Sequence, residues 1–154
     1  MKYKPKIIAV IGGAVASQKN LRYAEQVGRL IARSGNILIT GGMGGVMEAA
    51  SRGAHRARGL VIGIMPGLDR SAANDYVDIP IVTGMNQARN IIIARTSHCA
   101  IAIDGKYGTL SEIAYCLMFG VPVVGINTWR LEAPITHVQT AAEAVAKALK
   151  LIGA

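Results

Sequence analysis

Short apolar runs alternate along this chain with longer stretches in which apolar residues recur every three or four positions. The short runs have the pattern of buried strands, and the longer stretches have that of amphipathic helices. The expected strands are residues 6–11, 37–39, 60–65, 99–103 and 120–126, with 77–82 as a further short strand. Strands that alternate with helices over short connections predict a parallel sheet with right-handed crossovers. We therefore expect an α/β protein with a Rossmann-like three-layer α/β/α fold and a mostly parallel central sheet.

Residue types that begin and end helices bound several of these stretches. The first helical pattern starts at Asn20, which can cap a helix, and stops at Gly35. Thr140 is placed to cap the last helix, along residues 141–152. The other expected helices are about 46–58, a helix that includes Ile91–Ala94, and 110–118. The polar stretches 68–78 and 127–136 are expected to be loops.

The composition is that of a folded domain with a sizeable core. The chain has 154 residues, of which 51% are hydrophobic and only 17% charged, so a disordered protein is excluded. The sequence has no internal repeat, no linker, no N-terminal signal pattern and no apolar run long enough to span a membrane. We therefore expect one cytoplasmic domain over residues 1–154. Cys99 and Cys116 lie at apolar positions and are expected to be buried thiols.

The charge is strongly positive. Lys and Arg number 17 against 9 Asp and Glu, giving +8, which favours anionic partners. No basic run is interleaved with aromatic residues, so an anionic small molecule is expected rather than nucleic acid. The histidines, His55, His98 and His137, have no spacing that indicates a metal site or a catalytic triad.

Three of the expected strands end in glycine turns. These turns are Gly12-Gly13, Gly41-Gly42-Met43-Gly44-Gly45 and Gly105-Lys106-Tyr107-Gly108. Because parallel strands end at one edge of a sheet, the turns are expected to meet where such folds bind ligands. Main-chain N–H groups in turns of this kind hold phosphates. The simpler alternative is that glycine only serves tight strand–helix turns. None of the turns matches G-x-G-x-x-G or a Walker lysine motif, so NAD binding and ATP hydrolysis are not favoured.

Two charged residues near these turns allow two interpretations each. Thr109 and Glu112 have the S/T-x-x-E spacing of a capping box, so Glu112 is either a helix cap or a catalytic carboxylate. Arg89 either contacts a ligand or forms an ion pair at the surface.

Three sequence elements together resemble a known superfamily. They are Gly41-Gly42-Met43-Gly44-Gly45-Val46-Met47, then Met85-x-x-x-Arg89, then Gly105-x-x-Gly108-Thr109-x-x-Glu112. The combination is similar to the Lonely Guy (LOG) cytokinin-activating enzymes, long labelled "possible lysine decarboxylase". The molybdenum cofactor carrier proteins belong to the same superfamily. The resemblance covers roughly residues 6–126.

For the enzymes of that superfamily, the resemblance implies cleavage of a nucleoside 5′-monophosphate to a free base and ribose 5-phosphate, with no cofactor required. The family's arginine and glutamate fall on Arg89 and Glu112, which would be the catalytic residues. The phosphate would sit at Gly108-Thr109. A carboxylate suits this chemistry because it stabilises an oxocarbenium-like state and orients water. An arginine can hold the substrate through a forked contact.

The chain departs from the enzymes at one position in the third turn. They carry Pro-Gly-Gly before Tyr-Gly-Thr, whereas this chain has Asp104-Gly105-Lys106. Lysine can add a phosphate contact, and aspartate can accept from a hydroxyl or a pterin N–H. These residues and the run Ala88-Arg89-Asn90 look closer to the molybdenum cofactor carriers, whose cargo is a phosphorylated pterin. Lysine decarboxylation is not expected, because no lysine has the context of a pyridoxal phosphate Schiff base.

The expected function is therefore binding and carriage of a phosphorylated pterin or nucleotide, with the phosphoribohydrolase as the alternative. The expected ligand-binding residues are Gly12, Gly13, Gly41, Gly42, Gly44, Gly45, Met85, Arg89, Asp104, Gly105, Lys106, Tyr107, Gly108 and Thr109. The resemblance also implies a homodimer or homotetramer. The apolar helix patterns at residues 91–94 and 117–119 leave surface for such contacts.

Overall fold

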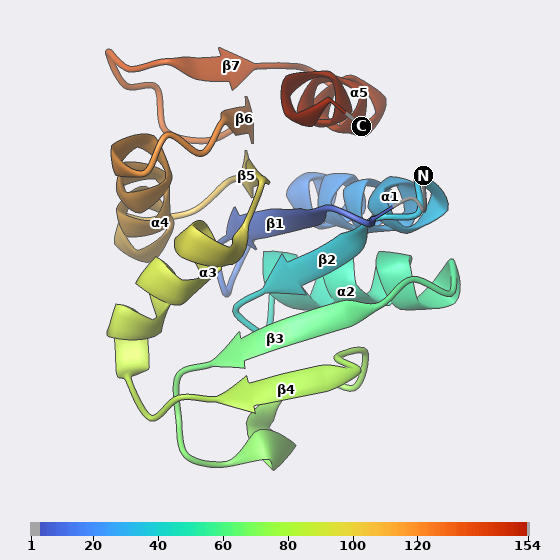
Figure 1. Cartoon of the computed structure of the whole chain (residues 1–154), viewed down its shortest axis with the longest axis vertical. Coiled ribbons are helices and arrows are strands. Elements are labelled where there is room, and N and C mark those ends of the chain that lie inside the picture. Colours follow the sequence, from blue (N-terminus) through green and yellow to red (C-terminus); the bar gives the residue numbers. More distant parts are fainter. Residues whose placement is uncertain (1–3, 154) are drawn as a thin grey trace.

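The described residues, 4–153, form a seven-stranded sheet in the computed structural model of the chain (Figure 1). The ends of the expected domain, residues 1–3 and 154, lie outside them. The strands are β1 (Ile7–Gly12), β2 (Ile37–Thr40), β3 (Val61–Met65), β4 (Ile79–Val82), β5 (Cys99–Ile103), β6 (Val123–Ile126) and β7 (Ile135–His137). Every pairing is parallel, so the expected Rossmann-like α/β fold is confirmed.

The strand order, β4-β3-β2-β1-β5-β6-β7, contains one switch point. From β1 the chain builds outward through β2, β3 and β4, and it then returns to add β5, β6 and β7 on the other side of β1. Gly12, the last residue of β1, pairs with Ile103, the last residue of β5. In sheets of this kind the crevice for a ligand lies beyond the carboxyl ends of the two strands at the switch.

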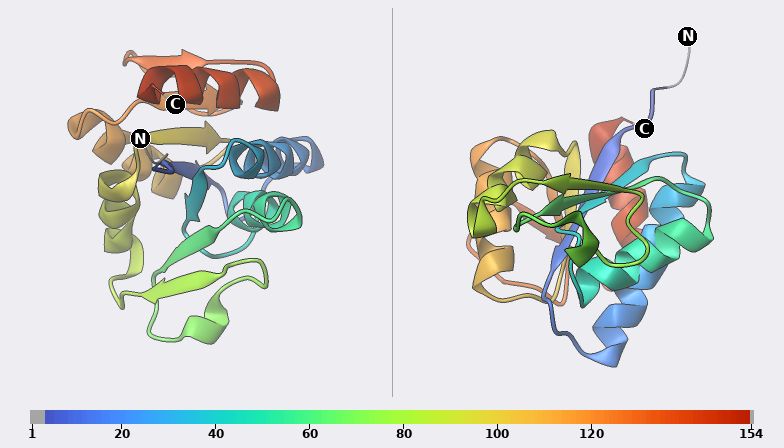
Figure 2. Two further views of the ribbon diagram at one scale, coloured as in Figure 1. Left: turned by 45° about the vertical axis from the view of Figure 1, so that its right-hand side comes forward. Right: turned by 90° about the horizontal axis from the view of Figure 1, so that it is seen from below.

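Helices cover both faces of the sheet (Figures 1 and 2). The helices are α1 (Gln18–Arg33), α2 (Val46–Arg56), α3 (Asn90–Thr96), α4 (Tyr107–Met118) and α5 (Ala141–Ile152), with 3₁₀ turns η1 (Arg70–Ala72) and η2 (Asn86–Arg89). Alternate side chains of a strand face opposite layers. Ile8 and Val10 of β1 pack with α1, α2 and α5, whereas Ala9 and Ile11 pack with α3 and α4. No helix within residues 4–153 is long and apolar enough to cross a membrane.

Glycine brings α1 and α2 into backbone contact. A Cβ atom added at Gly28 would lie 1.9 Å from the carbonyl oxygen of Ala50, and one added at Gly53 would lie 1.9 Å from that of Glu25. Any side chain at these two positions would therefore push the helices apart. The side chains that flank this contact consequently stand close together on the outer surface of the two helices.

Several predicted boundaries need correction. Helix α1 begins at Gln18 and is capped by Ser17, whose hydroxyl accepts from the Asn20 N–H at 3.2 Å, so Asn20 is an interior residue and not the cap. The expected loop at 127–136 leads into a seventh strand, β7, whose three residues are too few for an alternating pattern. The cap at Thr140 is confirmed, and Glu143 completes a capping box there.

The two thiols are buried, as predicted. Burial raises the pKa of Cys99 and of Cys116 to about 12. Both thiols are therefore protonated and unreactive at neutral pH.

Candidate functional site

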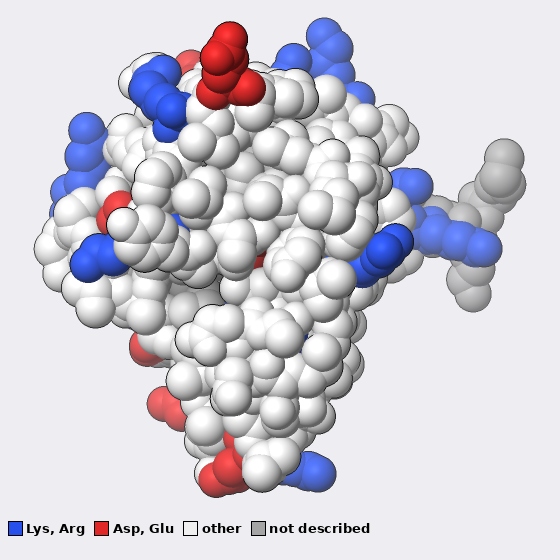
Figure 3. All heavy atoms as spheres, turned by 90° about the vertical axis from the view of Figure 1, so that its left-hand side faces the viewer, with Lys and Arg blue, Asp and Glu red and all other residues white. Residues whose placement is uncertain are grey.

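A cleft of about 360 Å³ opens beyond the carboxyl ends of β1 and β5, at the switch point of the sheet. Figure 3 faces this side of the molecule and shows a hollow near the middle of a largely uncharged surface. The residues that line the cleft are Gly12, Gly13, Ala14, Val15, Met47, Gln87, Arg89, Asn90, Lys106, Gly108, Thr109 and Glu112. The first and third glycine turns thus meet at the cleft, whereas the second turn, also expected there, contributes none of the lining residues.

The third turn leads into helix α4 in a way that leaves N–H groups free. The first helical hydrogen bond of α4 runs from the N–H of Leu110 to the carbonyl of Lys106, at 2.9 Å. The N–H groups of residues 107–109 precede it and have no carbonyl partner inside the helix. A Cβ added at Gly108 would meet nothing within 4 Å, so this N-terminus is open toward the cleft. Free N–H groups and the positive end of the helix dipole together favour an anion such as phosphate.

The turn before α4 is held in place from two sides. Gly105 has φ +104°, and a Cβ there would lie 2.2 Å from the Thr109 hydroxyl oxygen, so this position requires glycine. The Thr128 hydroxyl donates to the Asp104 carbonyl at 2.7 Å, and the Trp129 indole N–H donates to the Lys106 carbonyl at 3.0 Å. The N–H groups at the start of α4 are therefore held in place by the fold itself.

The predicted capping box at Thr109 and Glu112 is wrong. Helix α4 begins at Tyr107 with Lys106 at the N-cap position, and no side chain caps it. Thr109 is then the third residue of the helix and Glu112 the sixth, which places the carboxyl group well inside α4. Glu112 is buried, with only 6% of its surface exposed. Because Glu112 is not used as a cap, its carboxyl group is available to the cleft.

The carboxyl group of Glu112 is neutral over most of the physiological range. Burial raises its pKa from the ordinary 4.5 to about 8, although the positive charge of Arg89 acts in the opposite direction. Among the described residues no hydrogen bond holds this carboxyl group. A protonated carboxyl group can donate a hydrogen bond to a ligand, which a carboxylate cannot do.

Arg89 is a buried cation at the end of η2, with 9% of its surface exposed. It has no carboxylate within 4.0 Å among the described residues, so the surface ion pair considered from the sequence is wrong. Its Nη1 donates to the Asn90 side-chain oxygen, while its Nε is buried without a partner within residues 4–153. Desolvation lowers the pKa of Arg89, and Glu112 opposes that shift. A buried guanidinium with an unused donor is poised for an anionic or polar ligand.

The second glycine turn supports the site from beneath. A Cβ added at Gly41 would lie 2.7 Å from Nη2 of Arg89, so the guanidinium rests against the bare backbone there. Gly45 has φ +65°, and a Cβ there would lie 2.3 Å from the carbonyl of Gly13, which brings the first two turns together. Gly42 packs against Met65, while a Cβ at Gly44 would meet only the Ala14 carbonyl, at 3.8 Å.

Some predicted residues lie outside the cleft, and some cleft residues were not predicted. Met85 and Tyr107 are exposed and do not line it, and neither does Asp104, which begins the third turn with φ +57°. Asn90 was not predicted as a site residue, although its side chain contacts Arg89 and donates to the Ser111 hydroxyl at 3.1 Å. Its position directly after Arg89 was the available signal. Met47, in the first turn of α2, follows the second glycine turn in the same way.

Two of the histidines, His98 and His55, contact neighbouring residues of the fold. His98 Nδ1 accepts from the Ile7 N–H at 3.1 Å, and His55 lies 3.6 Å from a carboxylate oxygen of Asp78. Over residues 4–153 no group of three or more His, Cys, Asp or Glu side chains could hold a metal ion.

The fold and the site define a Rossmann-like protein with a cleft at the switch point of its sheet, lined by a helix N-terminus and a buried arginine. The chain belongs to the SLOG cluster4 family, whose family model matches residues 5–151. The predicted relationship to the LOG superfamily is thereby confirmed.

Solved structures of molybdenum cofactor proteins match the chain over nearly its whole length. It is 36% identical to the molybdenum cofactor binding protein of Rippkaea orientalis, with a TM-score of 0.91 over 99% of this chain and 100% of that one. It is 35% identical to the molybdenum cofactor carrier protein of Chlamydomonas reinhardtii, with a TM-score of 0.85 over 98% of this chain and 100% of that one.

A plant enzyme is a more distant relative. The cytokinin riboside 5′-monophosphate phosphoribohydrolase of Arabidopsis thaliana is 37% identical over 87 residues, which are 54% of this chain and 38% of the enzyme. The match thus spans well under half of the plant enzyme's length.

Proposed function

We propose that the chain binds the phosphorylated pterin of the molybdenum cofactor in this cleft and carries it without chemical change. The observation that supports this best is the likeness to two molybdenum cofactor proteins over at least 98% of this chain and 100% of theirs. The likeness to the plant phosphoribohydrolase extends over only 54% of the chain.

The chemistry of the cleft fits such a ligand. The N–H groups at residues 107–109, with Lys106 beside them, provide a seat for the terminal phosphate. The unused Nε donor of Arg89 can bind an acceptor on the rest of the ligand. The neutral Glu112 carboxyl group can donate to a ring nitrogen or carbonyl and accept from a ring N–H. Each polar group of the site thus has a counterpart on a phosphorylated pterin.

Binding of free cofactor tests this proposal. The purified protein is mixed with cofactor released from a denatured molybdoenzyme, and the mixture is separated by gel filtration under anaerobic conditions. We expect pterin, detected by its fluorescence after oxidation, to elute with the protein. Pterin that elutes only at the position of the free cofactor would overturn the proposal.

A second candidate function, nucleoside 5′-monophosphate phosphoribohydrolase, is favoured by one observation. Glu112 is not a helix cap but lines the cleft beside Arg89, as a catalytic carboxylate would. In that reaction the bond from C1′ of the ribose to the base nitrogen breaks, water oxygen adds to C1′, and a proton goes to the base. Incubation with AMP distinguishes the two functions: Glu112-dependent release of adenine would establish the enzyme, whereas background release from both wild type and Glu112→Gln would exclude it.

Fluorescence of Trp129 can detect a ligand at the expected phosphate-binding residues, because Trp129 is the only tryptophan in the chain. Its indole donates to the Lys106 carbonyl, and its ring centroid lies 6.0 Å from that of Tyr107. We expect a ligand bound at Lys106 and Gly108 to change the tryptophan emission in a saturable way. Trp129→Phe should lose the signal. Unchanged emission, with binding established by equilibrium dialysis, would place the ligand elsewhere.

We also propose that the chain forms a homo-oligomer through exposed apolar surface. On the side that carries the cleft, charged residues are sparse in the middle and gather at the margins (Figure 3). Exposed apolar side chains include Met118 of α4, 73% exposed, and Ile79 and Ile81 of β4, which are 45% and 44% exposed. Gel filtration with light scattering should give a mass at least twice that of the chain, and Met118→Glu should reduce it. A monomeric wild type would contradict this prediction.

A further inference from the structure

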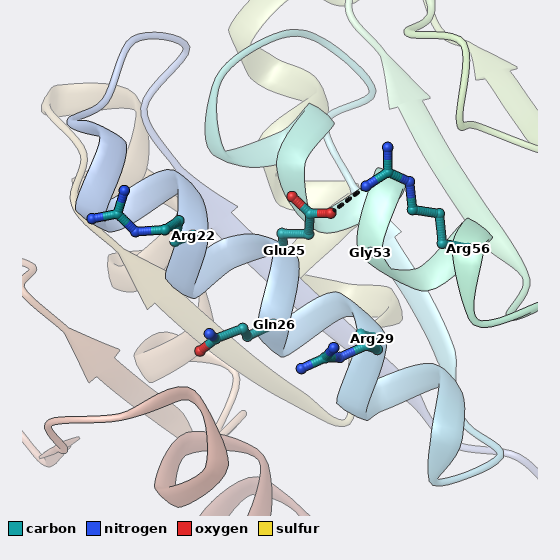
Figure 4. Close-up of a pocket in the computed structure, with 6 residues that line it drawn as sticks. All are labelled: Arg22, Glu25, Gln26, Arg29, Gly53 and Arg56. Carbon is teal, nitrogen blue, oxygen red and sulfur yellow. Dashed lines mark hydrogen bonds and ion pairs between the residues drawn. The ribbon is translucent and has the colours of Figure 1, made fainter.

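A second hollow, of about 350 Å³, lies on the outer surface between α1 and α2, separate from the cleft (Figure 4). The residues that line it are Arg22, Glu25, Gln26, Arg29, Gly53 and Arg56. Its floor is Gly53, where the two helices touch through their backbones. The side chains of α1 and α2 form the walls. We call this hollow the α1–α2 groove.

The positive charge of the arginines in the groove exceeds the negative charge of its one glutamate. Glu25 accepts from Arg52 at 3.0 Å and from Arg56 at 2.9 Å. Its hydrogen bond with Arg52 is the main reason why the pKa of Glu25 is lowered. Glu25 is therefore fully used by these two arginines. Arg22 and Arg29 are exposed and have no ion-pair partner among the described residues.

The excess charge extends along both helices. Together α1 and α2 contain six Lys or Arg residues and two Glu residues, a surplus of four, which is half of the net charge of +8. A surface of this kind attracts acidic partners and accelerates their association. A second copy of this chain does not suit the groove, because a symmetric contact would bring the same positive charges together.

The free arginines are arranged along a line. Arg22, Gln26 and Arg29 have the i, i+4, i+7 spacing of one helix face, and all three project from the same side of α1 in Figure 4. Two turns of helix separate Arg22 from Arg29, a rise of roughly 10 Å. Their guanidinium groups do not converge on one point in Figure 4, whereas a site for a single phosphate requires convergent donors. The arrangement fits a ligand with carboxylates spaced along its length.

We infer that the α1–α2 groove is a docking site for an acidic helical segment of another protein. Carboxylates two turns apart on that segment would form forked contacts with Arg22 and Arg29, and the Gln26 amide would bind between them. Nucleic acid fits less well, because the Glu25 carboxylate interrupts the positive surface and no aromatic ring within residues 4–153 lines the groove to stack bases.

The location of the groove leaves the cleft open. Val15, which lines the cleft and is 88% exposed, lies three residues before the start of α1, and Arg22 is in the second turn of that helix. A segment docked along α1 would therefore have one end near the mouth of the cleft. This position suits a protein that delivers the cleft ligand or receives it.

Binding of a designed peptide tests the inference. The probe is a fluorescein-labelled helical peptide with glutamates at positions i, i+4 and i+7, and its control is an isomer with the same glutamates on opposite faces. Fluorescence anisotropy should show that the wild type prefers the probe to the isomer. Arg22→Glu/Arg29→Glu should weaken probe binding by about tenfold or more, since two contacts are lost and repulsion is added.

Matched controls separate the groove from the overall charge. Arg70→Glu/Arg130→Glu makes the same change in net charge at exposed sites outside the groove and should weaken binding by no more than about twofold. Equal losses in the two double variants would overturn the inference, as would a wild type that binds probe and isomer equally or not at all. Tighter binding of single-stranded oligothymidylate, lost in Arg22→Glu/Arg29→Glu, would assign the groove to nucleic acid instead. A changed elution volume of that variant would assign it to self-association.

Discussion

Replacement of Arg89 by methionine is expected to weaken ligand binding by about 100-fold or more. The variant removes a buried guanidinium whose Nε has no partner among the described residues, and a charge-assisted hydrogen bond to a ligand contributes about 1.5–3 kcal/mol. Loss of the positive charge beside an anionic ligand adds to this cost. Methionine occupies similar space and needs no hydrogen bond, so the empty protein should remain folded. Isothermal titration with the cofactor or with AMP measures the loss.

Arg95 provides the matched control for this experiment. It lies on the helix that follows Arg89, is exposed, and has its guanidinium over the Phe119 ring at 3.9 Å, outside the cleft. Arg95→Met should bind ligand within about twofold of wild type. Arg89→Lys should bind more weakly than wild type. An ammonium group keeps the positive charge but cannot form the paired, forked hydrogen bonds of a guanidinium group. Equal affinities of Arg89→Met and wild type would show that Arg89 has no role in binding.

Ligand affinity is expected to fall as the pH rises above about 8, because Glu112 then loses its proton. An ionised carboxylate no longer donates to the ligand and repels its phosphate, so binding favours the protonated form. If the bound state keeps the proton, affinity falls by about tenfold per pH unit in this range. The phosphate itself does not cause the change, since its second ionisation is near pH 6 and is complete there.

Glu112→Gln distinguishes this effect from other titrations. Glutamine stays neutral and keeps a donor, so the variant should bind within about threefold of wild type at pH 7 and show no fall above pH 8. A wild type whose affinity is constant between pH 7 and pH 9 would contradict the role given to Glu112. Loss of binding in the variant at pH 7 would mean that the ligand needs the carboxyl group itself.

The same carboxyl group should make the stability of the empty protein depend on pH. The pKa of Glu112 is 4.5 when exposed and about 8 in the folded state, so the folded state binds the proton more tightly. The free energy of unfolding contributed by this group is fully present below pH 4.5 and is lost as the pH rises toward 8. Glu112→Gln should therefore be more stable than wild type at pH 8, and thermal unfolding at several pH values measures the difference.

Most of the fold could be predicted because strands and glycine turns leave strong local signals. The range 99–103 was predicted to the residue, since five apolar positions are bounded by polar ones. The start of α1 could not be predicted from the sequence, because Ser17 and Asn20 are both good N-cap residues. The hydrogen bond from the Asn20 backbone N–H to the Ser17 hydroxyl identifies Ser17 as the cap. Strand β7 is set by its pairing with β6, which no local pattern reveals.

The site was only partly predictable because its chemistry depends on where a helix starts. The spacing of Thr109 and Glu112 fits both a cap and a helix interior, and the choice is made by the turn that Trp129 and Thr128 hold in place. Trp129 is 23 residues from the carbonyl it binds, so no local pattern indicates this contact. The burial of Arg89 likewise follows from its position over Gly41, a contact between segments far apart in the chain.

Cofactor content after purification decides whether the cleft holds the molybdenum cofactor. Wild type, Arg89→Met and Arg95→Met are produced in a host that makes the cofactor, and molybdenum and oxidised pterin are measured per chain. We predict that wild type and Arg95→Met retain pterin and molybdenum together and that Arg89→Met retains at most about one tenth as much. A wild type without pterin that also fails to bind added cofactor would contradict the proposed function.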